Sequence, residues 1–218
     1  MKINWFMKFL LFYLISCCCF ISYSQNNHQW IGKKHNILLS NLINCNSSNE
    51  IQCMNLQWLN FSFDNHLTYG DKEIIAFIDL CNFQDKEKKV LLEFLNVPDD
   101  MPLRQIGNLL DSLENEAIKS KASPIFLGFW SVAKHSLNFW KTYKWDDDKK
   151  PPLMSIIKAD ALGLLKGVVL GAAFWIGSNF IFNVPDSIGI IGGSTIAVGF
   201  TALDSFRFSK KYKKRTES

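Results

Sequence analysis

Residues 99–140, DDMPLRQIGNLLDSLENEAIKSKASPIFLGFWSVAKHSLNFW, decide the fold of this chain. They contain two proline-initiated segments whose apolar residues recur at intervals of three and four, the spacing that places side chains on one face of an α-helix. Pro102 falls in the first turn of the first segment, and Pro124 follows the helix-capping residue Ser123 at the start of the second. We therefore predict two consecutive amphipathic helices.

The second of these helices carries an aromatic-rich apolar stripe at helical spacing: Phe126, Phe129, Trp130, Ala133, Leu137, Trp140 and Tyr143. Such a stripe usually forms core, although it can also lie on a membrane surface. Apolar spacing of three and four extends back to Gln25. Residues 25–145 are therefore predicted to form an all-α domain of about five helices.

Residues 146–152, DDDKKPP, separate this domain from a segment of different composition. Charge and two prolines interrupt the helical pattern and predict a linker. Three neighbouring carboxylates can bind a divalent cation, but a solvated linker is the simpler interpretation. Beyond the linker, Ala161 to Val184 is about 24 residues with one charge, and Ile188 to Phe206 again has one.

These two apolar runs are joined by residues 183–187, too few for anything but an antiparallel turn, so residues 153–206 are predicted to form a helical hairpin. At about 1.5 Å per residue, its first helix is long enough to cross ~30 Å of hydrocarbon. Small residues at every fourth position let helices approach closely, which favours packing in a membrane or an oligomer. The predicted packing residues are Gly163, Gly167, Gly171, Ala173, Gly177, Gly189, Gly193 and Ala197. A soluble hairpin buried against the helical domain is the alternative.

The charges of the hairpin, Lys166 and Asp204, fall at equal depth if the turn centres on Pro185. Because an unpaired charge in lipid is costly, we predict an ion pair between them. Residues 207–218 then form a basic tail suited to anionic lipid or cell-surface polymer. Its predicted contact residues are Lys210, Lys211, Lys213, Lys214 and Arg215. The rest of the chain is close to neutral, which argues against a nucleic-acid partner.

Residues 1–24 have the character of a secretory signal peptide. Two lysines precede the uncharged run from Phe9 to Tyr23, and small residues at Ser22 and Ser24 fit cleavage after Ser24. A lipidated Cys17 and an uncleaved anchor are the two alternatives. We expect an exported protein associated with a membrane of the cell envelope, in the periplasm or on the cell surface.

An oxidising compartment would permit a disulfide between Cys45 and Cys53, which flank a short polar stretch. Buried thiols are the alternative interpretation, because cysteine is a common small core residue. The sequence leaves both open.

No sequence motif for catalysis or metal binding is present. Four histidines are scattered without the close spacing of zinc sites, and HExxH, GxSxG and phosphate-loop patterns do not occur. We therefore expect neither an enzyme nor a bound metal or cofactor. The pair His35-Asn36 is predicted to open the first helix, whose apolar stripe contains Ile37, Leu38 and Leu42. It is expected to anchor that helix or to form part of a binding surface.

Residues 31–39, IGKKHNILL, and 157–163, IKADALG, resemble a group of largely uncharacterised exported bacterial proteins. These have a G-x-x-H-N-x-x-L start and a K-A-D-x-x-G glycine-zipper end. The C-terminal part also resembles class II bacteriocin precursors, whose Gly/Ala-rich helices permeabilise membranes. The helical domain and the hairpin together favour a non-enzymatic envelope protein with a bilayer-inserting hairpin that can self-associate. Bacteriocin-like membrane permeabilisation is the sharper form of this hypothesis. The alternative is a membrane-anchored module whose helical domain recognises an unknown protein partner.

Overall fold

A computed structural model describes residues 28–45, 78, 81, 83–145, 150–182, 198–199, 201–203 and 206–209, and for residues 170–182 it describes only the course of the helix. Its bounded helices are α2 (His28–Asn44), α5 (Asp85–Leu95), α6 (Leu103–Lys119), α7 (Pro124–Trp140) and α8 (Leu153–Phe182). Residues 198–199, 201–203 and 206–209 are also helical, and none of the described residues lies in a β-strand. The predicted all-α class is confirmed.

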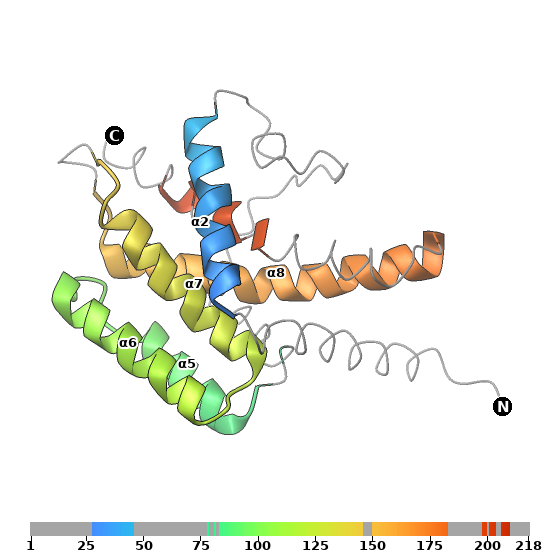
Figure 1. Ribbon diagram of the computed structural model, residues 1–218, viewed down its shortest axis with the longest axis horizontal. Coiled ribbons are helices and arrows are strands. Elements are labelled where there is room, and N and C mark those ends of the chain that lie inside the picture. The colour runs from blue at the N-terminus through green and yellow to red at the C-terminus, as the bar shows by residue number, and fades with distance from the viewer. Residues whose placement is uncertain are drawn as a thin grey trace.

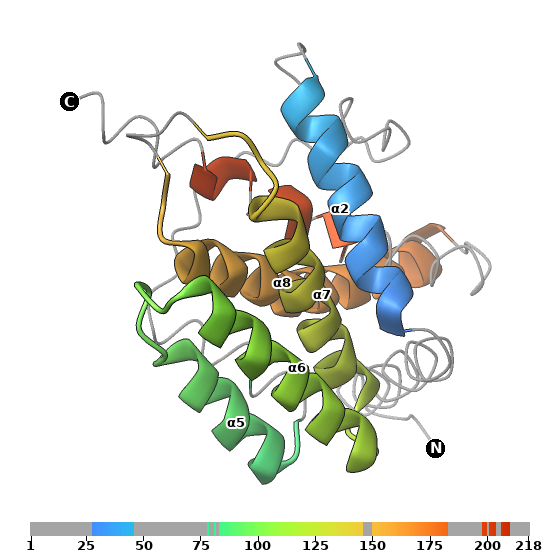
Figure 2. The ribbon, with the colours of Figure 1, turned by 60° about the vertical axis from the view of Figure 1, so that its left-hand side comes forward.

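Helix α7 lies at the centre of the domain and contacts α2, α6 and α8. Figure 1 and Figure 2 show α5 and α6 running alongside each other on one side of α7, with α2 on another side. Helix α8 crosses α7 with its N-terminal half, and its C-terminal end projects beyond the other labelled helices (Figure 1). The two halves of α8 therefore have different relations to the helical domain.

Helix α7 is central because it is apolar around most of its circumference. It begins as predicted, with Pro124 in its first turn and the Ser123 hydroxyl accepting a hydrogen bond from the backbone N–H of Phe126 at 3.4 Å. Its aromatic stripe is core: Trp130 is fully buried and meets Phe94 of α5 edge to face, with ring centroids 5.0 Å apart. The interpretation of the stripe as core is confirmed.

Helix α2 departs from its predicted start. It begins at His28, two turns before the His35-Asn36 pair, so that pair lies in its middle. Ile37 belongs to the predicted apolar stripe but is 54% exposed. The buried face consists instead of Ile31, Gly32, His35, Leu38, Leu39 and Leu42. A polar residue at a buried position explains why the apolar spacing alone misplaced this helix.

Glu87 of α5 links the starts of two helices. Its carboxylate accepts hydrogen bonds from the backbone N–H of Gln84 at 2.9 Å and of Ser123 at 2.6 Å. Glu87 is only 5% exposed, so both bonds are shielded from water. One side chain thus satisfies N–H groups that helix starts leave without a partner.

We expect Glu87→Ala to lower the free energy of unfolding by about 1–3 kcal/mol, because two N–H donors lose a buried acceptor. Urea unfolding measures the change. Glu93→Ala in the same helix is the matched control, since Glu93 is exposed and lies 3.9 Å from an exposed Lys89. The control should change stability by less than about 1 kcal/mol. Equal losses in the two variants would contradict the role of Glu87.

Candidate functional site

The two stretches that carry the resemblance, residues 31–39 (the first motif) and residues 157–163 (the second motif), meet inside the domain. Residues 32–36 of the first motif lie on α2, and residues 158–160 of the second lie near the start of α8. His35 and Asp160 face each other, with 3.6 Å between Nε2 of the histidine and Oδ2 of the carboxylate. Both residues are fully buried. The motifs therefore hold two helices together that are far apart in the sequence.

Asp160 is also bound by α7. Its Oδ2 accepts a hydrogen bond from Trp140 Nε1 at 3.1 Å and a second one from the Ser136 hydroxyl. Both donors are fully buried, and such hydrogen bonds compensate a carboxylate for the loss of water. We call His35, Ser136, Trp140 and Asp160 the buried cluster. It joins α2, α7 and α8 at one point.

The ring of His35 is oriented by its neighbour Asn36. Asn36 donates through Nδ2 to the carbonyl oxygen of His135 at 2.9 Å, and its Oδ1 lies 2.9 Å from Nδ1 of His35. Because Oδ1 is an acceptor, Nδ1 carries the ring proton. Burial lowers the pKa of His35 to about 4; the Asn36 hydrogen bond acts in the opposite direction and the charge of His135 in the same one. His35 is therefore neutral at pH 7.

A second polar cluster lies near the start of α2. Gln29 donates to Glu114 of α6, and its Oε1 lies 3.0 Å from Nε2 of His135 on α7. Glu114 is buried, and its carboxylate also pairs with Lys134 at 2.7 Å. We call the following residues the outer cluster: His28, Gln29, Asp111, Glu114, Lys134 and His135. It fastens the first turns of α2 to both α6 and α7.

The charges of the outer cluster act on one another. The hydrogen bonds that Lys134 donates to Asp111 and Glu114 raise the pKa of the lysine. Burial lowers the pKa of His135, and the nearby charge of Lys33 lowers it further, while Glu114 opposes the change. The lysine is held charged and His135 resists protonation.

Gly32 allows α2 to approach α7 between the two clusters. A Cβ atom at this position would lie 2.3 Å from Cδ2 of His135 and 2.5 Å from the carbonyl oxygen of Ser131. Neither distance is tolerable for a real side chain, so only glycine fits. The glycine of the first motif is thus explained by helix packing.

Lys158 fastens the start of α8 to the loop that follows α5. Its ammonium group donates to the carbonyl oxygen of Val97 and lies 2.8 Å from Oδ1 of Asp99. Partial burial acts to raise the pKa of Asp99, but hydrogen bonds from Lys158 and Ser155 and the lysine charge outweigh it and lower the pKa. The second motif therefore makes a contact on either side of α8, through Lys158 and Asp160.

The start of α8 belongs to the core of the helical domain. Ala161, Leu164 and Leu165 are fully buried in the same apolar cluster as α7. Gly163 and Gly167 are buried as well, and Lys166 is half-buried. The first half of α8 is thus part of the core of the helical domain. Apolar composition alone does not distinguish a segment that returns to the core from one that stands apart from it.

Other predicted site residues are described only in part. Gly171, Ala173 and Gly177 continue α8. Most of the rest lie outside the described residues: Cys17, Gly189, Gly193, Ala197, Asp204, Lys210, Lys211, Lys213, Lys214 and Arg215. The glycine packing, the Lys166 to Asp204 ion pair, the basic contact and the signal segment stay predictions.

Cys45 directly follows α2 and is disulfide-bonded. Its predicted partner, Cys53, lies outside the described residues, so their pairing stays a prediction. Cys81 is buried in the core.

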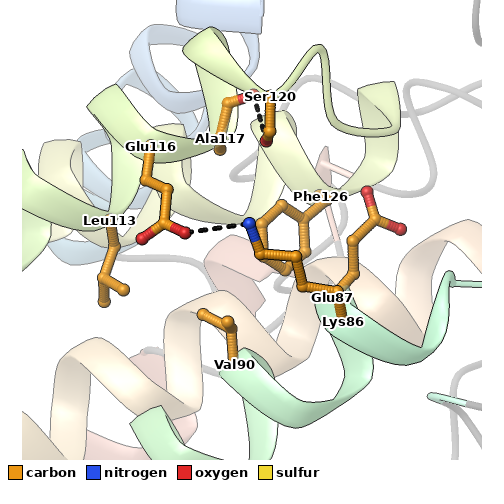
Figure 3. A pocket seen from close by; sticks show the side chains of 8 residues that line it. All are labelled: Lys86, Glu87, Val90, Leu113, Glu116, Ala117, Ser120 and Phe126. Carbon is orange, nitrogen blue, oxygen red and sulfur yellow. Dashed lines mark hydrogen bonds and ion pairs between the residues drawn. The ribbon is translucent and has the colours of Figure 1, made fainter.

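A shallow groove between α5 and α6 is the hollow shown in Figure 3. Its volume accessible to a water-sized sphere is about 20 Å³, and an ion pair between Lys86 and Glu116, 3.1 Å apart, crosses it. Sites for small molecules are usually larger and better enclosed, about 300–1,000 Å³. We assign no ligand to this groove. In the described part of the chain, no three side chains of the metal-binding types come together to hold an ion.

The described residues define an all-α domain whose helices are joined by two polar clusters. Among these helices, none is both long enough and apolar enough to cross a membrane. Comparison of the chain with protein-family models, curated proteins and solved structures finds no match.

Proposed function

We propose that this is an exported envelope protein whose helical domain holds one end of an apolar arm that inserts into a membrane. The observation that carries the proposal is the course of α8, a single helix of 30 residues. We call residues 153–166 the root and residues 167–182 the arm. The root is fixed in the core by Asp160 and Lys158, and the arm contains no charged residue.

The arm alone is too short to cross a membrane. Residues 167–182 extend about 24 Å as a helix, less than the ~30 Å of a hydrocarbon layer. Residues 161–182, which carry the single charge of Lys166, extend about 33 Å as a helix. None of the described helices is a membrane span as it stands, so insertion in this proposal needs residues 161–166 to leave the core and join the arm. In this proposal the docked helix is a stored form.

Export is supported by the first 24 residues and by Cys45. A basic start, an uncharged run and small residues before position 25 are typical of a signal peptide. Disulfides persist in oxidising compartments such as the periplasm or the cell surface, and Cys45 is disulfide-bonded. The partners in this proposal are the lipid bilayer and, through the glycine stripe formed by Gly163, Gly167 and Gly171, other copies of the chain. The basic tail would contact anionic lipid.

Dye release from lipid vesicles tests membrane permeabilisation. We expect the purified mature chain to release a dye trapped in anionic vesicles, and Gly177→Leu to reduce release several-fold, because a large side chain prevents close helix approach. Gly107→Ala on α6 is the control and should release dye normally. Undiminished release by Gly177→Leu would exclude the glycine-packing mechanism.

Cell fractionation tests the location. With a tag after Ser218, the protein should remain in the membrane pellet after alkaline washing, and protease added outside should remove the tag. Membrane retention without any dye release would support the alternative, a membrane-anchored module whose helical domain binds a protein partner. Release into the soluble fraction would contradict both.

A further inference from the structure

Three of the four histidines of the chain lie where α2 packs on α7. His28 and His135 belong to the outer cluster, and His35 belongs to the buried cluster. His35 also faces α8, so the same interface fixes the root. Histidine is the side chain whose charge changes most readily between pH 5 and 8.

We propose that this interface is a proton-operated latch: in mild acid, proton uptake by His35 favours the state in which α2 and the root of α8 are released from α7. The release of α2 is a property of the helical domain alone. Only its consequence, that the root and arm become available to a membrane, rests on the function proposed above.

The buried cluster has no good place for a charge on His35. The Nδ1 atom already carries a proton toward Asn36, so a second proton must enter at Nε2. That atom lies 3.6 Å from Asp160, beyond hydrogen-bond distance, and the carboxylate oxygen that it faces already accepts from Ser136 and Trp140. A buried imidazolium would therefore be poorly compensated, consistent with the pKa of about 4 to which burial lowers this group.

The outer cluster contributes charges of both signs. Lys33 and Lys134 disfavour a proton on His135. The carboxylates Asp111 and Glu114 both pair with Lys134 at 2.7 Å, so they are already engaged at neutral pH. His28 Nε2 lies 3.4 Å from Oε1 of Glu114, a contact between α2 and α6 that opposes release. We expect the effect of His35 to outweigh the contact of His28 with Glu114, because His35 is fully buried.

The sign of the pH dependence follows from linkage. When α2 is released, His35 titrates near its ordinary pKa of 6.5, whereas in the docked state it titrates at about 4. Between these values only the released state holds the extra proton, so docking weakens as the pH falls from about 6.5 to 4 and is unaffected above that range. For this one group, the docking equilibrium should shift about twentyfold between pH 7 and pH 5.

Hydrogen exchange of the intact protein without lipid tests the latch. After correction for the intrinsic exchange rate, amide protection in residues 28–44 and 153–166 should fall about twentyfold between pH 7 and pH 5, while α5 and α6 keep theirs. His35→Gln, which cannot titrate, should abolish most of this change, and His28→Gln should leave it in place. Unchanged or increased protection at pH 5 in the wild-type chain would overturn the proposal, the latter because Asp160 then binds the protonated ring.

A second measurement covers the case in which His35→Gln does not fold. Carbon-detected NMR of the wild-type histidines should show His35 still neutral at pH 5 in the docked state; a normal titration near pH 6.5 would overturn the proposal. Dye release at both pH values separates the latch from the membrane function. Exchange that opens in acid without dye release upholds the latch and counts against the membrane role, and equal release at both pH values without opening overturns the latch alone.

Discussion

Asp160→Ala is expected to lower the free energy of unfolding by about 2–6 kcal/mol, about 1–3 kcal/mol for each of the two buried donors that lose their acceptor. The Ser136 hydroxyl and the Trp140 indole N–H would lose their acceptor in a fully buried site. The substitution also removes the contact of α8 with His35 on α2. Urea unfolding at pH 7 measures the loss, and exchange in residues 153–166 shows whether the root becomes exposed.

Two further variants test whether the loss of stability comes from the buried hydrogen bonds of Asp160 or from the loss of a negative charge. Asp160→Asn keeps an oxygen acceptor of the same shape, so it should lose less than half as much stability as the alanine variant. Asp111→Ala removes a carboxylate that is mostly exposed, and its pair with Lys134 should contribute less than about 1 kcal/mol. If Asp160→Ala were no worse than Asp111→Ala, the buried cluster would not hold α8.

Helices α6 and α7 could be predicted closely because the residues that begin them act locally. Pro124 lies in the first turn of α7, and Ser123 binds an N–H only three residues away. Pro102 is predicted to lie in the first turn of α6 but is the N-cap residue directly before it, a difference of one position. Such features require no knowledge of the rest of the fold. The same holds for the aromatic stripe, whose members lie on α7 except for Tyr143, which follows the end of that helix.

The buried cluster could be predicted only in part. His35 and Asp160 each interrupt an otherwise apolar helix face, His35 between Ile31 and Leu38, and Asp160 between Ile157 and Leu164. A polar residue at such a position must find a partner inside the protein. That signal singles out both motifs, but it does not say that they meet. The parts played by Ser136 and Trp140 depend on how α7 packs between them.

Helix α8 shows why apolar composition alone does not place a segment. The charges and prolines of residues 146–152 predict a break, and the structure ends α7 at Trp140 and begins α8 at Leu153. The apolar residues that follow then return to the core of the same domain. Core and bilayer favour the same side chains, so composition does not show that the root belongs to the domain, whereas the contacts of Asp160 and Lys158 do.

Gly32→Ala is expected to lower the free energy of unfolding by about 3 kcal/mol, at the upper end of what overpacking costs. The added Cβ would lie 2.5 Å from the carbonyl oxygen of Ser131, which belongs to the backbone of α7 and cannot turn aside, and 2.3 Å from the His135 ring. Helix α2 would have to move away from α7, which separates His35 from Asp160. Exchange in residues 28–44 should therefore rise together with the loss measured in urea.

Gly107→Ala gives the opposite sign in a comparable helical setting. Its new Cβ would lie 4.0 Å from the nearest neighbour, Cδ2 of Leu137, which is ordinary contact. Alanine in place of an unconstrained helical glycine should then raise the free energy of unfolding by about 0.5–1 kcal/mol. Because both variants add the same methyl group to a helix, the difference between them isolates the close approach of α2 to α7. If Gly32→Ala also stabilised the protein, α2 would not lie this close to α7, and the contact between His35 and Asp160 could not form as described.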